Sequence, residues 1–174
     1  MAELIPVGIA GTGSYLPEKV IPNSWFEDKV ETSDEWIVQR TGIKERRFVE
    51  GGQATSHMCI QAGKRALEMA GLAAEDLDLV IVGTLTPDYY LPACAALVQD
   101  GLGAKNAGAF DISAACTGFL TALQSAEAFI ASGRMKRVLV LGAESLSRYL
   151  DLTDRTSCIL FGDGAGAAVL GIDA

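Results

Sequence analysis

The chain has few of the residues from which metal sites are built. Among its 174 residues there is one histidine, His57, and there are four cysteines, at positions 59, 94, 116 and 158. No two cysteines form a CxxC pair, and a single imidazole cannot complete the Cys/His set of a zinc site, so we expect no metal. Widely spaced free thiols are typical of proteins in a reducing compartment, which predicts a cytoplasmic location.

Positive charge and long apolar runs are also scarce. Lysine and arginine number 14 against 22 aspartates and glutamates, which gives a net charge of −8. This balance argues against binding to nucleic acid, whose phosphates need a basic face, and against an anionic membrane surface. No apolar run reaches the roughly 18 residues of a membrane span. The opening "MAELIPVGIAG" lacks the basic region of a signal peptide and is typical of a first strand.

Hydrophobic residues make up 49% of the chain, and their spacing switches between strand and helix patterns. Strands are predicted at 5–13, 43–49, 77–84, 107–113, 137–145 and 164–172, and helices at 32–42, 55–71, 91–103 and 115–133. This alternation predicts an α/β fold with a mostly parallel central sheet, right-handed crossovers and helices on both faces. Because the chain stops directly after a strand, we expect residues 1–174 to be one half of a larger fold.

Two glycine patterns call for a structural explanation. "GTGSYLP" follows the first strand but lacks a third glycine, and "GDGAGA" precedes a strand rather than a helix. Neither has the strand–turn–helix context of a dinucleotide-binding motif. We expect both patterns to serve tight turns and close packing in the sheet, with a turn at Gly11 and Gly13.

Local signals refine the helix and strand predictions. Thr32 and Glu35 stand at capping-box spacing, and Gly42 marks the end of the first helix. The segment 43–49 alternates like an exposed strand. One apolar face is predicted on the helix at 55–71, formed by Cys59, Ala62, Ala66 and Met69.

The segment "DISAACTGF", residues 111–119, surrounds Cys116 with small neighbours. The predicted elements place this thiol at the carboxyl end of a strand and in the first turn of the next helix. Ligands of open α/β sheets bind at the carboxyl ends of the strands, and the N–H groups of a helix start stabilise a thiolate. Ser113, Ala114 and Gly118 leave room for a substrate. The segment therefore indicates a nucleophilic cysteine whose own N–H is placed as an oxyanion donor.

The residues alone leave a second interpretation open, in which Cys116 is a small apolar residue on a packed helix. Its helical stripe continues through Phe119, Leu120, Leu123, Ala126 and Ile130. We expect Cys59, Cys94 and Cys158 to lie in the core. We interpret His57 as a surface or capping residue, so the chain offers a thiol without a convincing proton shuttle.

"DISAACTGF" resembles the nucleophile segment of β-ketoacyl-acyl carrier protein synthase III, a family of thiolase-fold condensing enzymes. Three further segments are similar to the family in the same order: "GTGSYLPEKVIPN", "TSDEWIVQRTGIKERR" and "DLTDRTSCILFGDGAGAAVL". The likeness extends over essentially the whole chain. It implies a thiolase-like fold, with residues 1–174 as the N-terminal half of a duplicated structure, and a homodimer built across this half.

The resemblance also implies a reaction. The cysteine that matches Cys116 takes an acyl group from acyl-CoA. The carbanion formed when malonyl-acyl carrier protein loses CO2 then attacks the acyl-enzyme, and the product begins a fatty-acid chain. Covalent capture as a thioester splits one difficult step into two easier ones. Acyl-CoA is a substrate here, so no cofactor is implied.

Four residues carry over from the family's CoA site. Trp36 matches the tryptophan that stacks on adenine, and Arg40, at i+4 on the same helix face, matches an arginine at the nucleotide end. Thr32 and Arg155 match a threonine and a second arginine there. Without the resemblance, the residues favour Trp36 as the apolar anchor of a short helix and both arginines as solvated surface charges.

Two departures from the family pattern leave alternatives open. Leu91 stands where straight-chain members have a bulky aromatic that reaches the partner subunit's acyl pocket, so the primer preference stays open. The family's catalytic His and Asn belong to a C-terminal half that this chain does not contain. The alternatives are a related acyltransferase or secondary-metabolite condensing enzyme, or a half that binds CoA or dimerises without catalysis.

Overall fold

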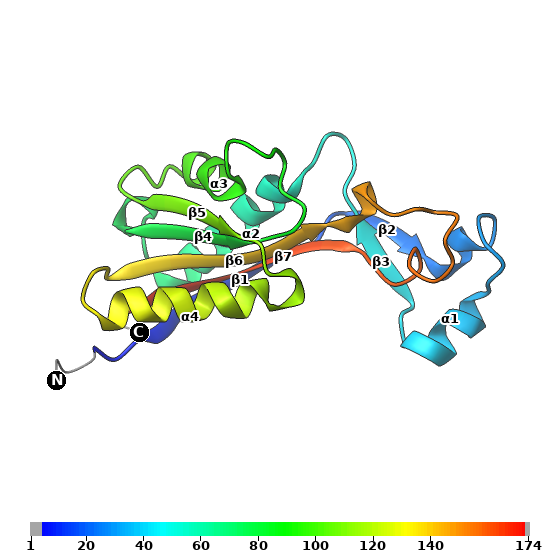
Figure 1. Ribbon diagram of the computed structural model, residues 1–174, viewed down its shortest axis with the longest axis horizontal. Helices are drawn as coiled ribbons and strands as arrows, with labels where there is room; N and C mark the ends of the chain where they lie inside the picture. Colours follow the sequence, from blue (N-terminus) through cyan, green and yellow to red (C-terminus); the bar gives the residue numbers. More distant parts are fainter. Residues whose placement is uncertain (1–4, 173–174) are drawn as a thin grey trace.

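A five-stranded mixed sheet forms the centre of the computed structural model, which describes residues 5–172 (Figure 1). Its strands are β1 (Gly8–Tyr15), β4 (Leu79–Gly83), β5 (Gly108–Ile112), β6 (Arg137–Ser145) and β7 (Asp163–Gly171), in the spatial order β1-β7-β6-β4-β5. Strand β4 is parallel to β5 and β6, whereas β7 is antiparallel to β6 and β1. Four strands therefore point one way, which confirms the predicted fold class with β7 as the exception.

Helices cover both faces of this sheet, as predicted. Helices α2 (Thr55–Ala70) and α3 (Cys94–Leu102) pack on one face, and α4 (Gly118–Ala131) packs on the other (Figure 1). Alternate residues of β4 divide between the two cores: Val80 and Val82 face α2 and α3, whereas Leu79 and Ile81 face α4. Burial on both faces explains why this strand reads as a continuous apolar run.

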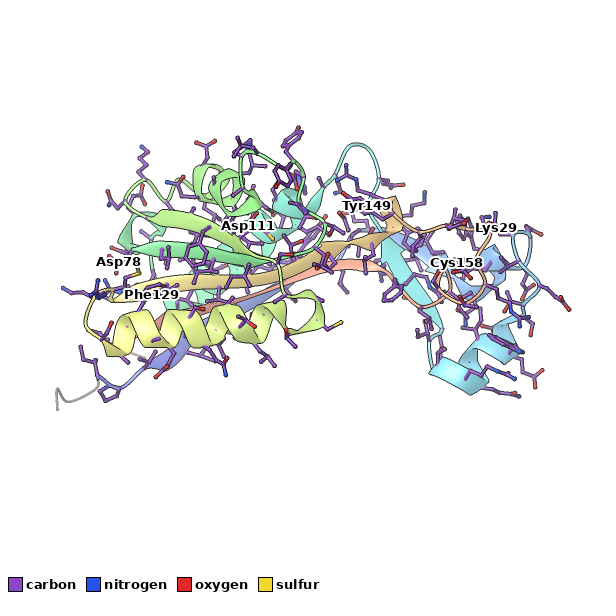
Figure 2. All side chains as sticks on the ribbon, viewed as in Figure 1. Lys29, Asp78, Asp111, Phe129, Tyr149 and Cys158 are labelled. Carbon is purple, nitrogen blue, oxygen red and sulfur yellow. The ribbon has the colours of Figure 1, made fainter. Side chains whose placement is uncertain are left out.

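A smaller lobe extends from one end of the sheet. It contains the antiparallel pair β2 (Lys19–Pro22) and β3 (Glu45–Phe48), the 3-10 helix η1 (Asn23–Phe26) and helix α1 (Asp34–Thr41). The segment 149–162 returns through this lobe before entering β7. The lobe has its own core, in which Cys158 is buried (Figures 1 and 2).

The predicted turn at Gly11 and Gly13 is wrong, because β1 runs through both glycines to Tyr15. A Cβ at Gly11 would lie 2.4 Å from the carbonyl oxygen of Ala66, and one at Gly13 would lie 2.2 Å from that of Ala62. The glycines let α2 lie directly on β1, so the predicted close packing is confirmed and only the turn is wrong.

Three other local predictions need correction. The N-cap of α1 is Ser33, whose Oγ accepts the N–H of Trp36 at 3.1 Å, so Thr32 and Glu35 form no capping box; Gly42 ends the helix as predicted. Met69 is 66% exposed, because the buried face of α2 continues through Ala66 and Ala70 rather than through Met69. Strand β3 alternates as predicted but is exposed on one face alone: Glu45 is exposed, whereas Arg46 is only 7% accessible.

Within residues 5–172, none of the helices has the length and hydropathy that crossing a membrane requires. The same part of the chain has no cluster of three or more His, Cys, Asp or Glu side chains arranged to hold a metal ion.

Candidate functional site

Cys116 lies between the carboxyl end of β5 and the start of α4. It occupies a 3-10 turn, η3 (Ala115–Thr117), so the thiol comes just before helix α4 rather than in its first turn. Cys116 is exposed, whereas Cys59, Cys94 and Cys158 are buried. The interpretation of Cys116 as a packed core residue is therefore wrong, and the predicted burial of the other three cysteines is confirmed.

The backbone immediately before the thiol is strained. Ala115 has a φ of 48°, and among the described residues it is the one non-glycine position with positive φ. A side chain in this region costs about 1–3 kcal/mol, and such strain collects at functional sites. The left-handed residue turns the chain sharply between β5 and α4, which places the next side chain, Cys116, on the outside of the turn.

Glycines let this turn sit directly on the sheet. A Cβ at Gly83, the last residue of β4, would lie 2.6 Å from the carbonyl carbon of Gly118. One at Gly142 of β6 would lie 2.9 Å from the Cβ of Phe119. The start of α4 is thus held against two neighbouring strands, and this contact fixes the height of Cys116 above the sheet.

Asp111, on β5, connects the strand end that precedes Cys116 to helix α3. Its carboxylate accepts the N–H groups of Cys94 and Ala95, each at 2.7 Å, and so caps the start of α3 (Figure 2). A carboxylate at a helix N-terminus satisfies free donors and complements the helix dipole. The acidic residue that opens "DISAACTGF" therefore anchors the strand end that precedes the cysteine.

A cavity of about 710 Å³ opens at Cys116. Apart from Cys116, Glu144 is the one ionisable residue among those that line it, and the rest are small or apolar: Gly13, Gly83, Leu85, Ala115, Phe119, Gly142, Ala143, Leu146, Phe161, Gly162, Gly164, Gly166 and Ala167. Such a lining suits an acyl chain better than a polar metabolite. His57 is exposed at the start of α2 and does not line this cavity, as expected for a surface residue.

Sequence reasoning missed Glu144. One carboxylate oxygen accepts the N–H of Leu85 at 2.8 Å, and the other accepts the hydroxyl of Thr86 at 2.6 Å. Glu144 thus ties the end of β6 to the segment that follows β4. The sequence contained a signal for Glu144. It is an acidic residue near the end of a predicted buried strand, and ligands of parallel sheets bind at the ends of their strands.

The four residues predicted at a nucleotide site lie together in the small lobe. The guanidinium carbon of Arg40 lies 4.1 Å from the centre of the Trp36 ring, and that of Arg155 lies 4.8 Å from it. A terminal nitrogen of Arg155 donates to the carbonyl of Glu31 at 2.8 Å. The hydroxyl oxygen of Thr32 is buried without a partner among the described residues.

The turn that carries Arg155 is closed by Asp154. Its carboxylate accepts the hydroxyls of Thr156 and Ser157, each at 2.6 Å, and the N–H of Thr156 at 2.9 Å. The Ser157 and Thr156 hydroxyls hold the pKa of Asp154 below its ordinary value. The same segment continues to Phe161 and Gly162 in the cavity wall, so the cluster around Trp36 and the cavity share one stretch of chain.

Leu91 does not line the cavity of Cys116. It lies in the loop between β4 and α3, where Tyr89, Tyr90 and Leu91 are 63%, 103% and 85% exposed. Three consecutive large side chains in solvent form an apolar tip, which is unusual on a free surface. Within this chain, residue 91 is therefore separate from the cysteine site.

Comparison with known proteins places this arrangement in a family. The chain is 56% identical over 171 residues to the β-ketoacyl-[acyl-carrier-protein] synthase III of Caldanaerobacter subterraneus subsp. tengcongensis, which covers 98% of this chain and 52% of that protein. It is 58% identical over 167 residues to the enzyme of the same name from Desulfitobacterium hafniense strain Y51, covering 96% of this chain and 50% of the relative. The family model described as 3-oxoacyl-[acyl-carrier-protein (ACP)] synthase III matches residues 110–174.

The chain belongs to the synthase III family. It superposes on the 3-oxoacyl-[acyl-carrier-protein] synthase III of Aquifex aeolicus VF5 with a TM-score of 0.93 at 54% identity, over 95% of this chain and 54% of that structure. A priming β-ketosynthase from the R1128 polyketide biosynthetic pathway gives 0.94 at 41% identity, over 98% of this chain and 51% of that one. The recognition made from the sequence motifs is confirmed, as is the thiolase-like fold. The chain spans about half the length of the synthase III relatives it matches.

Proposed function

We propose that the protein carrying this chain is a β-ketoacyl-[acyl carrier protein] synthase III that starts fatty-acid chains. The Cys116 thiolate attacks the thioester carbon of acyl-CoA, the acyl group moves to sulfur, and CoA leaves as a thiolate that takes a proton from solvent. Malonyl-acyl carrier protein then loses CO2, and the resulting carbanion attacks the acyl-enzyme. A new carbon–carbon bond forms, and the Cys116 thiolate is released with a β-ketoacyl-carrier protein.

The observation that carries this proposal is the exposed Cys116 thiol at the mouth of a largely apolar cavity. The sulfur follows a strained residue, Ala115, at the carboxyl end of a parallel strand, which is where α/β sheets bind ligands. Small neighbours leave space for the tetrahedral intermediate. The apolar wall suits the alkyl part of a primer, and the cavity is large enough for a short one.

The cluster of Trp36, Arg40 and Arg155 supports CoA as the acyl donor. An indole flanked by two guanidinium groups offers a stacking surface for adenine together with cations for phosphates. Thr32 adds a hydroxyl with no partner in the described chain. Because the chain is acidic overall, a local pair of arginines is a selective feature rather than part of a general basic face.

Self-association across this half is also proposed. Strand β5 lies at the edge of the sheet, and its residues are exposed or half-buried. Unpaired strand edges and apolar tips are surfaces that a partner covers. In a homodimer, the loop with Leu91 would reach the partner's acyl pocket, and a leucine there would leave more room than an aromatic ring.

Acylation of the thiol tests the function directly. The protein, in its longest natural form, is incubated with a panel of acyl-CoAs and analysed by mass spectrometry. We expect an acyl adduct on Cys116 that the Cys116→Ala variant lacks, and a β-ketoacyl product once malonyl-acyl carrier protein is added. Folded protein that takes no acyl group from any donor, yet binds CoA, would instead be a non-catalytic binding half.

A second candidate is a priming condensing enzyme of secondary metabolism. The likeness to the R1128 priming ketosynthase, which extends over 98% of this chain, favours it. Both enzymes would use the same thiol and the primer preference is open, so the carrier protein separates them. Condensation with malonyl on the carrier protein of fatty-acid synthesis supports fatty-acid initiation, whereas condensation only with malonyl on a polyketide carrier protein supports the second candidate.

A further inference from the structure

A buried arginine joins the two chain segments that form the Trp36 cluster. Arg46 lies on β3, is 7% accessible, and stacks on Phe26 with 4.7 Å between its guanidinium carbon and the ring centre. No ion pair with a carboxylate involves it in the described part of the chain, and burial lowers its pKa. Burying a cation without a counter-charge is costly unless its donors are well used.

The two terminal nitrogens of Arg46 donate in two directions, whereas its Nε is buried without a hydrogen-bond partner among the described residues. One terminal nitrogen donates to the carbonyl of Ile159 at 2.6 Å, in the segment that carries Arg155. The other donates to the carbonyl of Ile21 at 3.2 Å and to Oδ1 of Asn23 at 2.7 Å. The planar fork of an arginine can span acceptors on separate segments, which the single ammonium of a lysine does less well.

Asn23 passes this connection to helix α1. Its Nδ2 donates to the carboxylate of Asp34 at 2.8 Å and to the carbonyl of Ile43 at 2.7 Å, so it holds the chain on both sides of the helix. Helix α1 carries Trp36 and Arg40. A continuous set of hydrogen bonds therefore runs from the Arg155 segment through Arg46 and Asn23 to the Trp36 helix.

We infer that Arg46 is a positioning residue that sets the spacing between helix α1 and the Arg155 segment for binding the nucleotide end of CoA. This inference rests on the proposed function. Arg46 touches no substrate. It connects helix α1 to the Arg155 segment, so that the indole and both guanidinium groups are already in position before CoA binds.

The test compares two acyl donors in the longest natural form of the protein. One is acyl-CoA, and the other is the same acyl group on pantetheine, which lacks the nucleotide. For Arg46→Lys and Arg46→Met we expect KM for acyl-CoA to rise by about 10-fold, since small misplacements of binding groups are costly. With acyl-pantetheine, the acylation rate of Cys116 should change by less than about twofold. The matched control is Arg47→Met, because Arg47 is the next residue of β3 but its partners lie outside the Trp36 cluster. They are the carboxylate of Glu45 and the carbonyls of Pro17 and Glu18.

A second variant guards against loss of folding at the buried site. Asp34→Ala breaks the connection at an exposed position, and Glu35→Ala is its control, because Glu35 also lies in the first turn of α1 but accepts only from Gln39 of the same helix. Asp34→Ala should raise KM for acyl-CoA, and Glu35→Ala should not.

The outcomes separate the two proposals. The unchanged protein should be acylated by both donors and should prefer acyl-CoA. If the Arg46 and Asp34 variants keep that preference, the role of Arg46 is overturned and the proposed function stands. Equal reaction with both donors in the unchanged protein also overturns it. If neither donor acylates Cys116, the proposed function fails and the inference fails with it.

Discussion

At the level of single side chains, Cys116 differs from the other three cysteines in its access to solvent. Cys59 and Cys94 contact each other in the core between α2 and α3, and Cys158 is buried in the small lobe. The contact with Cys94, and then burial, raise the pKa of Cys59 well above its ordinary value; burial raises that of Cys158. Since the thiolate is the reactive form, Cys59 and Cys158 are protected from alkylation both by burial and by their raised pKa values.

This contrast predicts selective alkylation. In the folded protein, iodoacetamide at pH 8 should modify Cys116 about 100-fold faster than the other cysteines, which react only after local opening. Peptide mapping by mass spectrometry measures each rate. In denaturant all four should react alike. Rapid labelling of Cys59 or Cys158 in native protein would contradict the buried positions described here.

Asp154 gives a prediction about pH. Because hydroxyls of Ser157 and Thr156 donate to its carboxylate, its folded pKa lies below the ordinary value of about 3.9. The ionised form therefore stabilises the Arg155 turn at any pH above that ordinary value, and this contribution is lost as the pH falls through the folded pKa. Ser157→Ala should move the carboxyl pKa upward in an NMR titration. An unchanged pKa in this variant would mean that the Ser157 hydroxyl does not hold the carboxylate.

At the level of elements, the sequence predicted more of the sheet than of its surroundings. The strand at 77–84 and the helix at 55–71 are recognisable because their apolar periods reflect burial by neighbouring elements. Gly11 misled the prediction, since a glycine that admits a helix onto a strand looks the same in sequence as one that starts a turn. Arg46 also escaped notice, because its acceptors, two backbone carbonyls and the side chain of Asn23, lie far from it along the chain.

In the candidate site, too, some residues could be predicted from local sequence and others could not. Cys116 was singled out by its local motif and Trp36 by the resemblance to the family, and the i+4 spacing of Arg40 placed it correctly beside the indole. Glu144 was not found, since its importance comes from hydrogen bonds to residues near 85 that only the sheet order brings close. Local patterns predict what one element does, whereas contacts between distant elements require the fold.

The packing of β4 on α4 predicts the effect of one methyl group. Gly83→Ala would place a Cβ against the backbone of Gly118, which cannot yield as a side chain can. We expect a loss of about 1–3 kcal/mol in the free energy of unfolding, together with slower acylation of Cys116 as the turn shifts. Urea denaturation measures the first effect. Gly166→Ala is the matched control for stability, because a Cβ there meets no atom within 4 Å. Equal stabilities for the two variants would contradict the close approach.

At the level of the whole molecule, the sheet has two unlike edges. The β1 edge is covered by α2, whose Met69 sulfur accepts the N–H of Thr12 at 3.1 Å. The β5 edge lies open beside the apolar tip at Tyr89, Tyr90 and Leu91. A net charge of −8 keeps copies apart in general, so association through one face needs a local apolar surface strong enough to overcome it.

Tyr90 is the sharpest probe of that surface, since its side chain makes almost no contact within the chain. Tyr90→Asp should leave the fold intact but add charge and remove apolar area at the proposed interface, so we expect the dimer dissociation constant to rise by at least about 100-fold. Analytical ultracentrifugation over a dilution series measures it, and circular dichroism checks the fold. Met69→Asp, at the covered edge, is the control for an added charge on an exposed apolar residue. If both variants associate as the unchanged protein does, the partner does not cover this tip, and residue 91 cannot reach a neighbouring acyl pocket.

If only Tyr90→Asp separates the subunits, its acylation kinetics will further show whether Leu91 acts across the interface. The primer preference should broaden in that variant, because the loop no longer closes the partner's pocket.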